Sequence, residues 1–188
     1  MEIEAIINQI YPVPEAAVVK LKQVTEEVTL PKGQILFEAG KISRNVYFLK
    51  KGIVRSYKFQ QDTDVTIWLG REGDTVISLK NYVEDKPAYE NIELLEDSIL
   101  YRISSSDLQG LFNEDIFLAN WGRKFAETEL IKVEERLIAR QFSLASDRYN
   151  DLLRDNPDLL QRVQLGYIAS YLGVTQVSLS RIRSNIYK

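Results

Sequence analysis

The segment LGYIASYLGVTQVSLSRIRS, residues 165–184, sets polar side chains on an apolar frame. Ala169 lies four residues before Gly173, which is the spacing of two helices that cross at a tight turn. The small side chain of Ala169 lets the second helix approach closely, and Gly173 adopts the positive φ of the turn without steric cost. Thr175 follows where a hydroxyl can cap the free N–H groups of the second helix. The segment therefore predicts a helix-turn-helix.

The second helix has two chemically different faces. Its inner, apolar positions are Leu179, Ile182 and Ile186, and its outward positions are Gln176, Val177, Ser180, Arg181 and Ser184. In a DNA groove an Arg can bind guanine, a Gln can bind adenine, and Val methyls can contact the thymine methyl. The outward face thus predicts DNA recognition, while an ordinary helical hairpin with a solvated face stays open as an alternative.

We expect the DNA contacts to divide into two kinds. Direct base reading is expected from Arg181 first and Gln176 second, with support from Val177, Ser180 and Ser184. Phosphate contacts are expected from Thr175, Ser178 and Arg183, because the first two lie at the positive end of the helix dipole and Arg183 lies at the flank.

The charge distribution agrees with this division. The 188-residue chain has a net charge of −3, but residues 159–188 contain no Asp or Glu. Arg162, Arg181, Arg183 and Lys188 give that segment +4. A basic end on an acidic body is expected when only the last segment contacts phosphates.

The chain contains neither Cys nor His. Disulfides, thiolate zinc sites and His-ligated haem are thereby excluded, as are nucleophilic triads with a His base. We expect no enzymatic activity, no metal and no cofactor. The acidic N-terminus resembles no signal peptide, and no stretch approaches the roughly 18 apolar residues of a membrane span. These features favour a cytoplasmic protein.

The fold class expected is α+β. Residues 1–23 indicate short helices broken by Pro12 and Pro14, and residues 25–103 contain many short β-type runs separated by glycines, which is typical of an antiparallel β-roll or jelly roll. Ser106 is the expected N-cap of the helix that follows. The predicted division is a β-roll domain with flanking helices (1–115), a long helix (116–142) and a helix-turn-helix domain (143–188).

The long helix carries two apolar stripes. The first follows heptad spacing and comprises Ala119, Arg123, Ala126, Leu130, Val133, Leu137 and Arg140; the second comprises Leu118, Trp121 and Phe125. Two stripes require two partners, so we expect one stripe to pack on the β domain and residues 116–140 to form a homodimer. The alternative is a helix buried wholly within one chain.

This layout resembles the Crp/Fnr family of bacterial transcription regulators over nearly the whole chain. The likeness depends on LPKGQILFEAG, VYFLKKGIVRSY and EGD within residues 30–74, on IELLEDSILYRISSSDLQGLF at 92–112, and on YIASYLGVTQVSLSRIR near the end. It implies a sequence-specific regulator that binds a palindromic DNA site as a homodimer, with RNA polymerase and a small-molecule effector as further partners.

The resemblance also shows where this sequence departs from the family. Cyclic-nucleotide-binding members have a Glu for the ribose and an Arg-Ser pair for the phosphate; here Ser78 replaces the Glu, and Ala88 and Tyr89 replace the pair. The usual mode of cyclic-nucleotide binding is therefore not expected. Ser78, Lys80, Ala88 and Tyr89 are the candidate effector contacts, and the effector itself is undefined. The β wing that follows the second helix in the family is also expected to be missing.

The sequence is also compatible with a second function class. A small-molecule-binding β-roll whose terminal helices serve only protein–protein association would have the same elements. It predicts no salt-dependent DNA binding, whereas a regulator loses DNA affinity steeply as salt rises.

Overall fold

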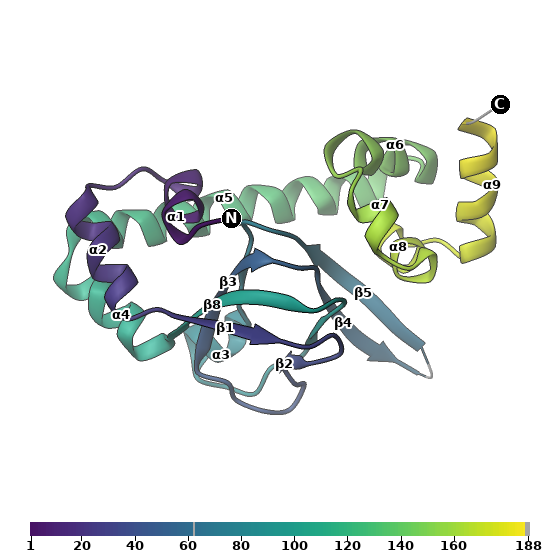
Figure 1. The fold of residues 1–188 in the computed structure, drawn as a ribbon. Coiled ribbons are helices and arrows are strands. Elements are labelled where there is room, and N and C mark those ends of the chain that lie inside the picture. Colours follow the sequence, from purple (N-terminus) through teal and green to yellow (C-terminus); the bar gives the residue numbers. More distant parts are fainter. Residues whose placement is uncertain (62, 187–188) are drawn as a thin grey trace.

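The computed structural model describes residues 1–61 and 63–186, apart from the side chain of Ile186. Figure 1 shows three parts: a β-roll, a long helix α5 that runs across one side of it, and a group of short helices at the end of α5. We call this last group, residues 145–186, the head. The mixed architecture confirms the expected fold class.

The strands of the roll follow the short apolar runs of the sequence. They are β1 (Glu26–Leu30), β2 (Ile35–Phe37), β3 (Asn45–Lys51), β4 (Val54–Gln60), β5 (Thr63–Gly70), β6 (Thr75–Val76), β7 (Asn91–Leu94) and β8 (Ser98–Ser104). They form two four-stranded antiparallel sheets in the orders β1-β8-β3-β6 and β2-β7-β4-β5. Strand β5 is consequently the end strand of the second sheet.

The inner faces of the two sheets share one apolar core. Its buried members are Leu36, Phe37, Tyr47, Leu49, Val54, Val76, Ile92, Leu94 and Leu100. Large side chains from both sheets therefore fill the middle of the roll, and the rings of Phe37 and Tyr47 pack edge to face at a centroid distance of 5.9 Å.

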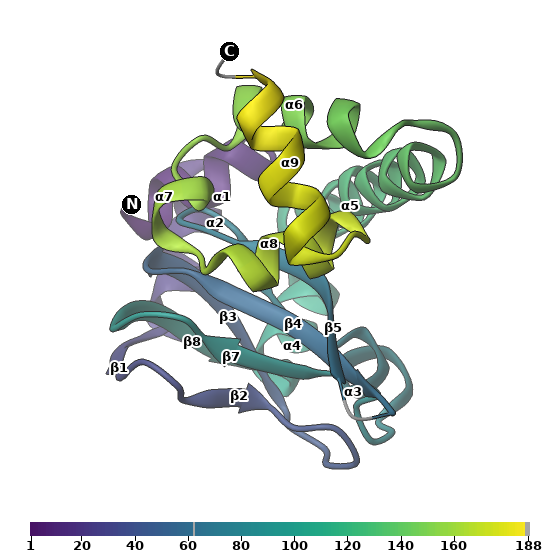
Figure 2. The same cartoon turned by 90° about the vertical axis from the view of Figure 1, so that its right-hand side faces the viewer.

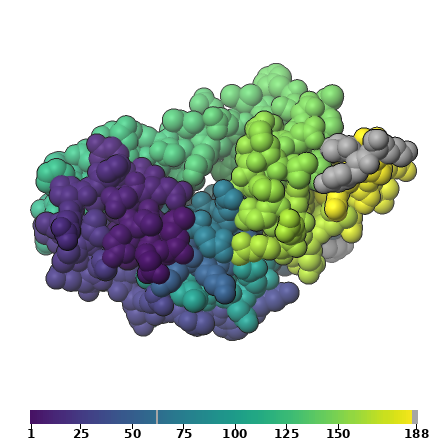
Figure 3. Space-filling view, turned by 45° about the horizontal axis from the view of Figure 1, so that its top comes forward, coloured from purple at the N-terminus to yellow at the C-terminus, as the bar shows by residue number. Residues whose placement is uncertain are grey.

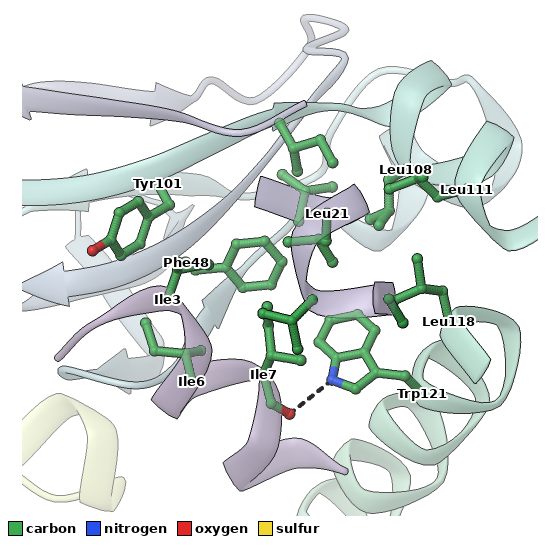
Figure 4. Close-up of a cluster of buried hydrophobic side chains, with 14 residues drawn as sticks. Ile3, Ile6, Ile7, Leu21, Phe48, Tyr101, Leu108, Leu111, Leu118 and Trp121 are labelled. Carbon is green, nitrogen blue, oxygen red and sulfur yellow. Dashed lines mark hydrogen bonds between the residues drawn. The ribbon is translucent and has the colours of Figure 1, made fainter. Parts of the chain in front are cut away.

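A second core joins the N-terminal helices to the start of α5 (Figure 4). Helices α1 (Ile3–Ile10) and α2 (Glu15–Gln23) lie on either side of Pro12 and Pro14, as expected. Trp121 on α5 is 1% exposed, and its indole N–H donates to the backbone oxygen of Ile7 over 2.9 Å. The inner stripe of α5 is thus anchored on the roll side of the molecule.

Two helices follow strands of the roll, α3 (Leu79–Glu84) after β6 and α4 (Ser105–Glu114) after β8. The expected N-cap of α4 was wrong by two residues. Ser104, not Ser106, accepts the backbone N–H of Asp107 over 3.0 Å. Three consecutive serines could each cap a helix, and β8 decides among them because its pairing ends at Ser104.

Helix α5 (Ile116–Phe142) begins at the cap Asp115, whose carboxylate accepts the N–H of Phe117 over 2.9 Å. Along its second half Leu130 is 69% exposed, Val133 49% and Leu137 55%. The alternative that this helix is buried wholly within one chain is therefore wrong. In Figure 3 much of the α5 surface lies uncovered between the N-terminal helices and the head.

The head contains α6 (Ala145–Asp155), α7 (Leu159–Arg162), α8 (Leu165–Leu172) and α9 (Gln176–Ile186). Its core also takes in two buried residues of the roll, Ile53 and Leu69. Figure 2 shows α8 lying over β4 and β5, with α9 in front of it and uncovered. The head is therefore packed against the roll as well as joined to α5.

Candidate nucleic-acid interface

The turn between α8 and α9 has the geometry that the sequence predicts. Gly173 has φ +70° and ψ 34°. The N–H of Val174 donates to the oxygen of Ala169 over 2.9 Å, and that of Gly173 donates to the oxygen of Ser170 over 3.0 Å. This pair of bonds is a Schellman turn, which ends α8 and satisfies carbonyls that would otherwise lack partners.

The start of α9 is capped by Thr175. Its Oγ1 accepts the backbone N–H of Ser178 over 3.1 Å, and the two hydroxyls lie 3.0 Å apart. The predicted cap is therefore present, and the hydroxyls of Thr175 and Ser178 stand together at the N-terminal end of the helix.

Burial separates the two faces of α9 as the helical wheel predicts. Leu179 is completely buried, and Ile182 is partly buried against the same core, which includes Ile168, Ala169 and Leu172. The side chain of Ile186, the third residue expected to face the core, lies outside the described part of the chain. Ala169 is 2% exposed, so a larger residue would separate the two helices.

The opposite face of α9 lies in solvent. Its exposed residues are Gln176, Val177, Ser180, Arg181, Arg183 and Ser184. Val177 is 61% exposed, so most of its surface is open to an external partner. The hydroxyls of Ser180 and Ser184 donate to backbone oxygens of their own helix, over 3.0 and 2.9 Å, and keep their acceptor lone pairs outward.

Within the described residues, the arginines of this face differ from most of those elsewhere in the chain, which are paired with carboxylates. Seven arginines form ion pairs with carboxylates: Arg44, Arg55, Arg71, Arg102, Arg123, Arg154 and Arg162. Within the described residues Arg181 and Arg183 have no such partner. Their charges remain available to an external anion.

Arg162 does not share this freedom. It binds Glu72 over 2.7 Å and also pairs with Glu96, both from the roll. Its charge, counted with the basic end of the chain, is neutralised inside the molecule. Lys188 lies outside the described residues, so Arg181 and Arg183 are the charges that the described part of residues 159–188 presents to solvent.

The four candidate effector contacts do not share one environment, and Lys80 on α3 is partly exposed. Ser78 is completely buried, and its hydroxyl has no hydrogen-bond partner among the described residues. Ala88 is 4% exposed, whereas Tyr89 is 49% exposed and its pKa is raised by partial burial. Ala88 has no donor for a buried phosphate, so the residues present do not fit a cyclic nucleotide held in the family's manner.

Sequence reasoning missed the residues that hold the head in place. Arg148 on α6 donates to the oxygen of Leu172 over 2.9 Å and to that of Ser143 over 2.5 Å. It thereby joins the last carbonyl of α8 to the end of α5. No local pattern marks this role, because a single arginine on a polar helix is ordinary in sequence.

Other classes of site find little support in the described residues. There is no group of three or more His, Cys, Asp or Glu in this part of the chain that could hold a metal ion. None of the described helices combines the length and the apolar composition of a membrane span.

Comparison with known proteins agrees with this architecture. Residues 27–115 match the family model of the cyclic nucleotide-binding domain. Among curated protein sequences, none matches the chain significantly. Solved structures extend the match from the roll to the head. FixK2 from Bradyrhizobium japonicum covers 87% of this chain with a TM-score of 0.73 at 21% identity, over 85% of its own length.

The chain has the fold of the Crp/Fnr regulators. A protein from Eubacterium rectale described as a Crp/Fnr-family transcriptional regulator matches with a TM-score of 0.71 and 15% identity, over 93% of this chain and 85% of that one. The c-di-GMP-responsive regulator CLP from Xanthomonas campestris matches with a TM-score of 0.69 and 16% identity, over 93% and 92%. The Crp/Fnr fold thus includes the roll, α5 and the head.

Proposed function

We propose that this protein is a cytoplasmic transcription regulator that binds DNA as a homodimer, with α9 in the major groove. The observation that carries the proposal is the outward face of α9. It is exposed, free of carboxylates and rich in base-complementary side chains, and it lies on a helix whose other face is fixed in the head core.

Base reading is assigned to the outward side chains. Arg181, whose guanidinium has no ion-pair partner in the part of the chain that the structure describes, suits a guanine edge, and Gln176 at the leading end of α9 suits an adenine edge. Val177 is positioned for a thymine methyl, and Ser180 and Ser184 offer acceptors. These five residues would decide which sequence is bound.

Phosphate contacts are assigned to Thr175, Ser178 and Arg183. The two hydroxyls lie at the N-terminal end of α9, and Arg183 is an exposed cation without an ion-pair partner among the described residues. Such contacts fix the position of the protein on the duplex and carry no sequence information of their own.

The homodimer is supported by the uncovered face of α5. Its exposed apolar residues after the first turns are Leu130, Ile131, Val133, Leu137, Ile138 and Phe142. At about 100° per residue these positions occupy one side of the helix, opposite the stripe that holds Trp121. A second copy of α5 would bury this face. Two heads related by a two-fold axis would then read half-sites roughly 34 Å apart.

An effector, if one acts on this protein, is not a cyclic nucleotide held in the family's manner, because Ala88 and Tyr89 replace the phosphate-binding pair. DNA recognition by α9 does not depend on an effector.

The experiment that tests the proposal is a salt titration of binding. Fluorescence anisotropy of the full chain on labelled duplex is measured between about 50 and 200 mM salt. The logarithm of affinity should fall linearly with the logarithm of salt concentration. A small-molecule module whose helices only associate with proteins would show no such binding, and that result would reject the regulator.

A further inference from the structure

The head contacts the roll along a seam between α8 and β5, which is an edge strand of the roll. The backbone N–H of Thr66 on β5 donates to the hydroxyl of Ser170 on α8 over 2.9 Å, and that hydroxyl lies 3.4 Å from the oxygen of Asp64. Thr66 is completely buried, although β5 ends its sheet. Ser170 thus takes the place of a neighbouring strand.

A buried arginine lies beside this contact. Arg55 on β4 is 1% exposed and is held by Asp64 over 2.5 Å, by Glu93 over 3.2 Å and by the hydroxyl of Thr66 over 2.9 Å. Its guanidinium carbon lies 3.7 Å from the ring centroid of Tyr167 on α8. A cation–π contact of a desolvated guanidinium is stronger than one in water, so the contact between Arg55 and Tyr167 helps to hold α8 in place on the roll.

Ion pairs extend the seam towards α7. Arg162 pairs with Glu72 and Glu96, and Arg71 pairs with Asp158 over 2.9 Å. In each pair one residue comes from the head and its partner from the roll. We call the contacts of Ser170, Tyr167, Arg162 and Asp158 with the roll the α8–β5 seam.

The covalent connection between α5 and the head constrains the orientation of the head much less than the α8–β5 seam does. Between α5 and α6 only Ser143 and Leu144 intervene, and both have extended backbones, with ψ of 147° and 155°. Helical continuity is therefore broken at this point, and Arg148 is the side chain that bridges it. The direction in which α9 points depends on contacts across the gap.

We propose that the α8–β5 seam sets the half-site spacing that the dimer accepts. This inference rests on the proposed function. In a two-fold dimer the rolls and the α5 pair form the frame, and the separation of the two α9 helices follows from how each head sits on that frame. A head held at the seam offers one separation. A head attached only at Ser143–Leu144 would accommodate several.

The test uses the duplex that the full chain selects and a series derived from it, with one or two base pairs added or removed between the half-sites. Each added base pair moves a half-site by about 3.4 Å and rotates it by about 35°. A duplex with a single half-site measures head binding alone. The wild type should lose affinity about tenfold or more for each wrong spacing, a loss comparable to that of one base-pair contact.

Two variants open the seam from opposite sides. Ser170→Ala removes the partner of the Thr66 N–H, and the double variant R71Q/E96Q weakens the ion pairs while leaving every head residue intact. Ser146→Ala is the matched control, because its hydroxyl lies on α6 away from the seam and, among the described residues, donates a hydrogen bond only to Asp147. Circular dichroism and melting establish that each variant is folded.

The seam variants should bind the single half-site as the wild type does and should distinguish the spacings by less than about threefold. If the folded R71Q/E96Q and Ser170→Ala proteins keep the wild-type spacing profile, the inference is overturned; if only Ser170→Ala fails to fold, R71Q/E96Q decides. A wild type that binds DNA but accepts all spacings equally also overturns it and leaves the proposed function standing. A wild type that binds no duplex rejects both.

Discussion

The turn at Gly173 predicts a pair of glycine substitutions with opposite effects on stability. An alanine Cβ at Gly173 would lie 3.6 Å from Nη2 of Arg140, which is ordinary contact, so steric overlap contributes little. The cost comes from φ +70°, which lies in the left-handed region, and amounts to about 1–2 kcal/mol for a residue with a side chain.

Gly166 supplies the matched comparison within the same helix. Its φ is not positive, and an added Cβ would meet only Oε1 of Gln176 at 3.8 Å. Gly166→Ala should therefore stabilise the head by about 0.5 kcal/mol, because it lowers the entropy of the unfolded chain. The two variants should differ by about 2 kcal/mol in unfolding free energy, although each adds the same methyl group.

The assay is urea unfolding followed by circular dichroism, with amide hydrogen exchange to locate the change. Gly173→Ala should speed exchange at Val174 and Leu179, whose N–H groups bond across the turn and in the first turn of α9. Gly173→Asn should recover part of the loss, since Asn tolerates the left-handed region. Equal stability of the Gly173→Ala and Gly166→Ala proteins would refute the left-handed turn at Gly173 between α8 and α9.

Three further predictions concern the base-reading face, the dimer and the ion pairs. Arg181→Ala should cost about 1–3 kcal/mol of DNA binding per head and relax the preference at one base pair, whereas Arg183→Ala should weaken binding to all sequences alike. A competition assay over single-base variants of the site checks this. Uniform weakening by Arg181→Ala would contradict its role in base reading. Leu137→Glu should convert the dimer to monomer in sedimentation, while Val177→Glu on α9 leaves the dimer intact; an unchanged Leu137→Glu dimer contradicts the interface on α5. Burial opposes the ionisation of Glu72, but hydrogen bonds from Arg162 and the Gly52 amide outweigh it and lower the pKa from 4.5 to about 2. Ionised Glu72 therefore stabilises the fold fully above pH 4.5, and this contribution is lost as the pH falls towards 2. Because Glu72 is partly exposed, we expect the unfolding free energies of wild type and Glu72→Gln to differ by about 1–2 kcal/mol at neutral pH. The two values should converge in acid.

Local patterns in the sequence were sufficient for the elements and for the faces of α9. Alternating apolar residues place the strands, and proline positions separate α1 from α2. The spacing of Ala169, Gly173 and Thr175 predicts both the turn and the cap. These features are decided by residues within a few positions of one another, so a single sequence contains them.

The α8–β5 seam could not be predicted from local patterns, because its partners lie far apart in the sequence. Thr66 and Ser170 are separated by 104 residues, and neither has an unusual neighbour in sequence. Arg162 was counted with the free basic charges of the chain end because its partners, Glu72 and Glu96, come from the roll. Arg71 and Glu72, in the short segment between Gly70 and Gly73, likewise bind residues of the head that lie far away in the sequence.

In the proposed function, the outward face of α9 reads a two-fold symmetric DNA site. Selection of bound fragments from a random duplex library by the full chain tests it most directly. We predict an enriched palindrome whose half-sites lie about one helical turn apart, roughly 34 Å. Recovery of sequences with no shared motif, or of none above background, would contradict it.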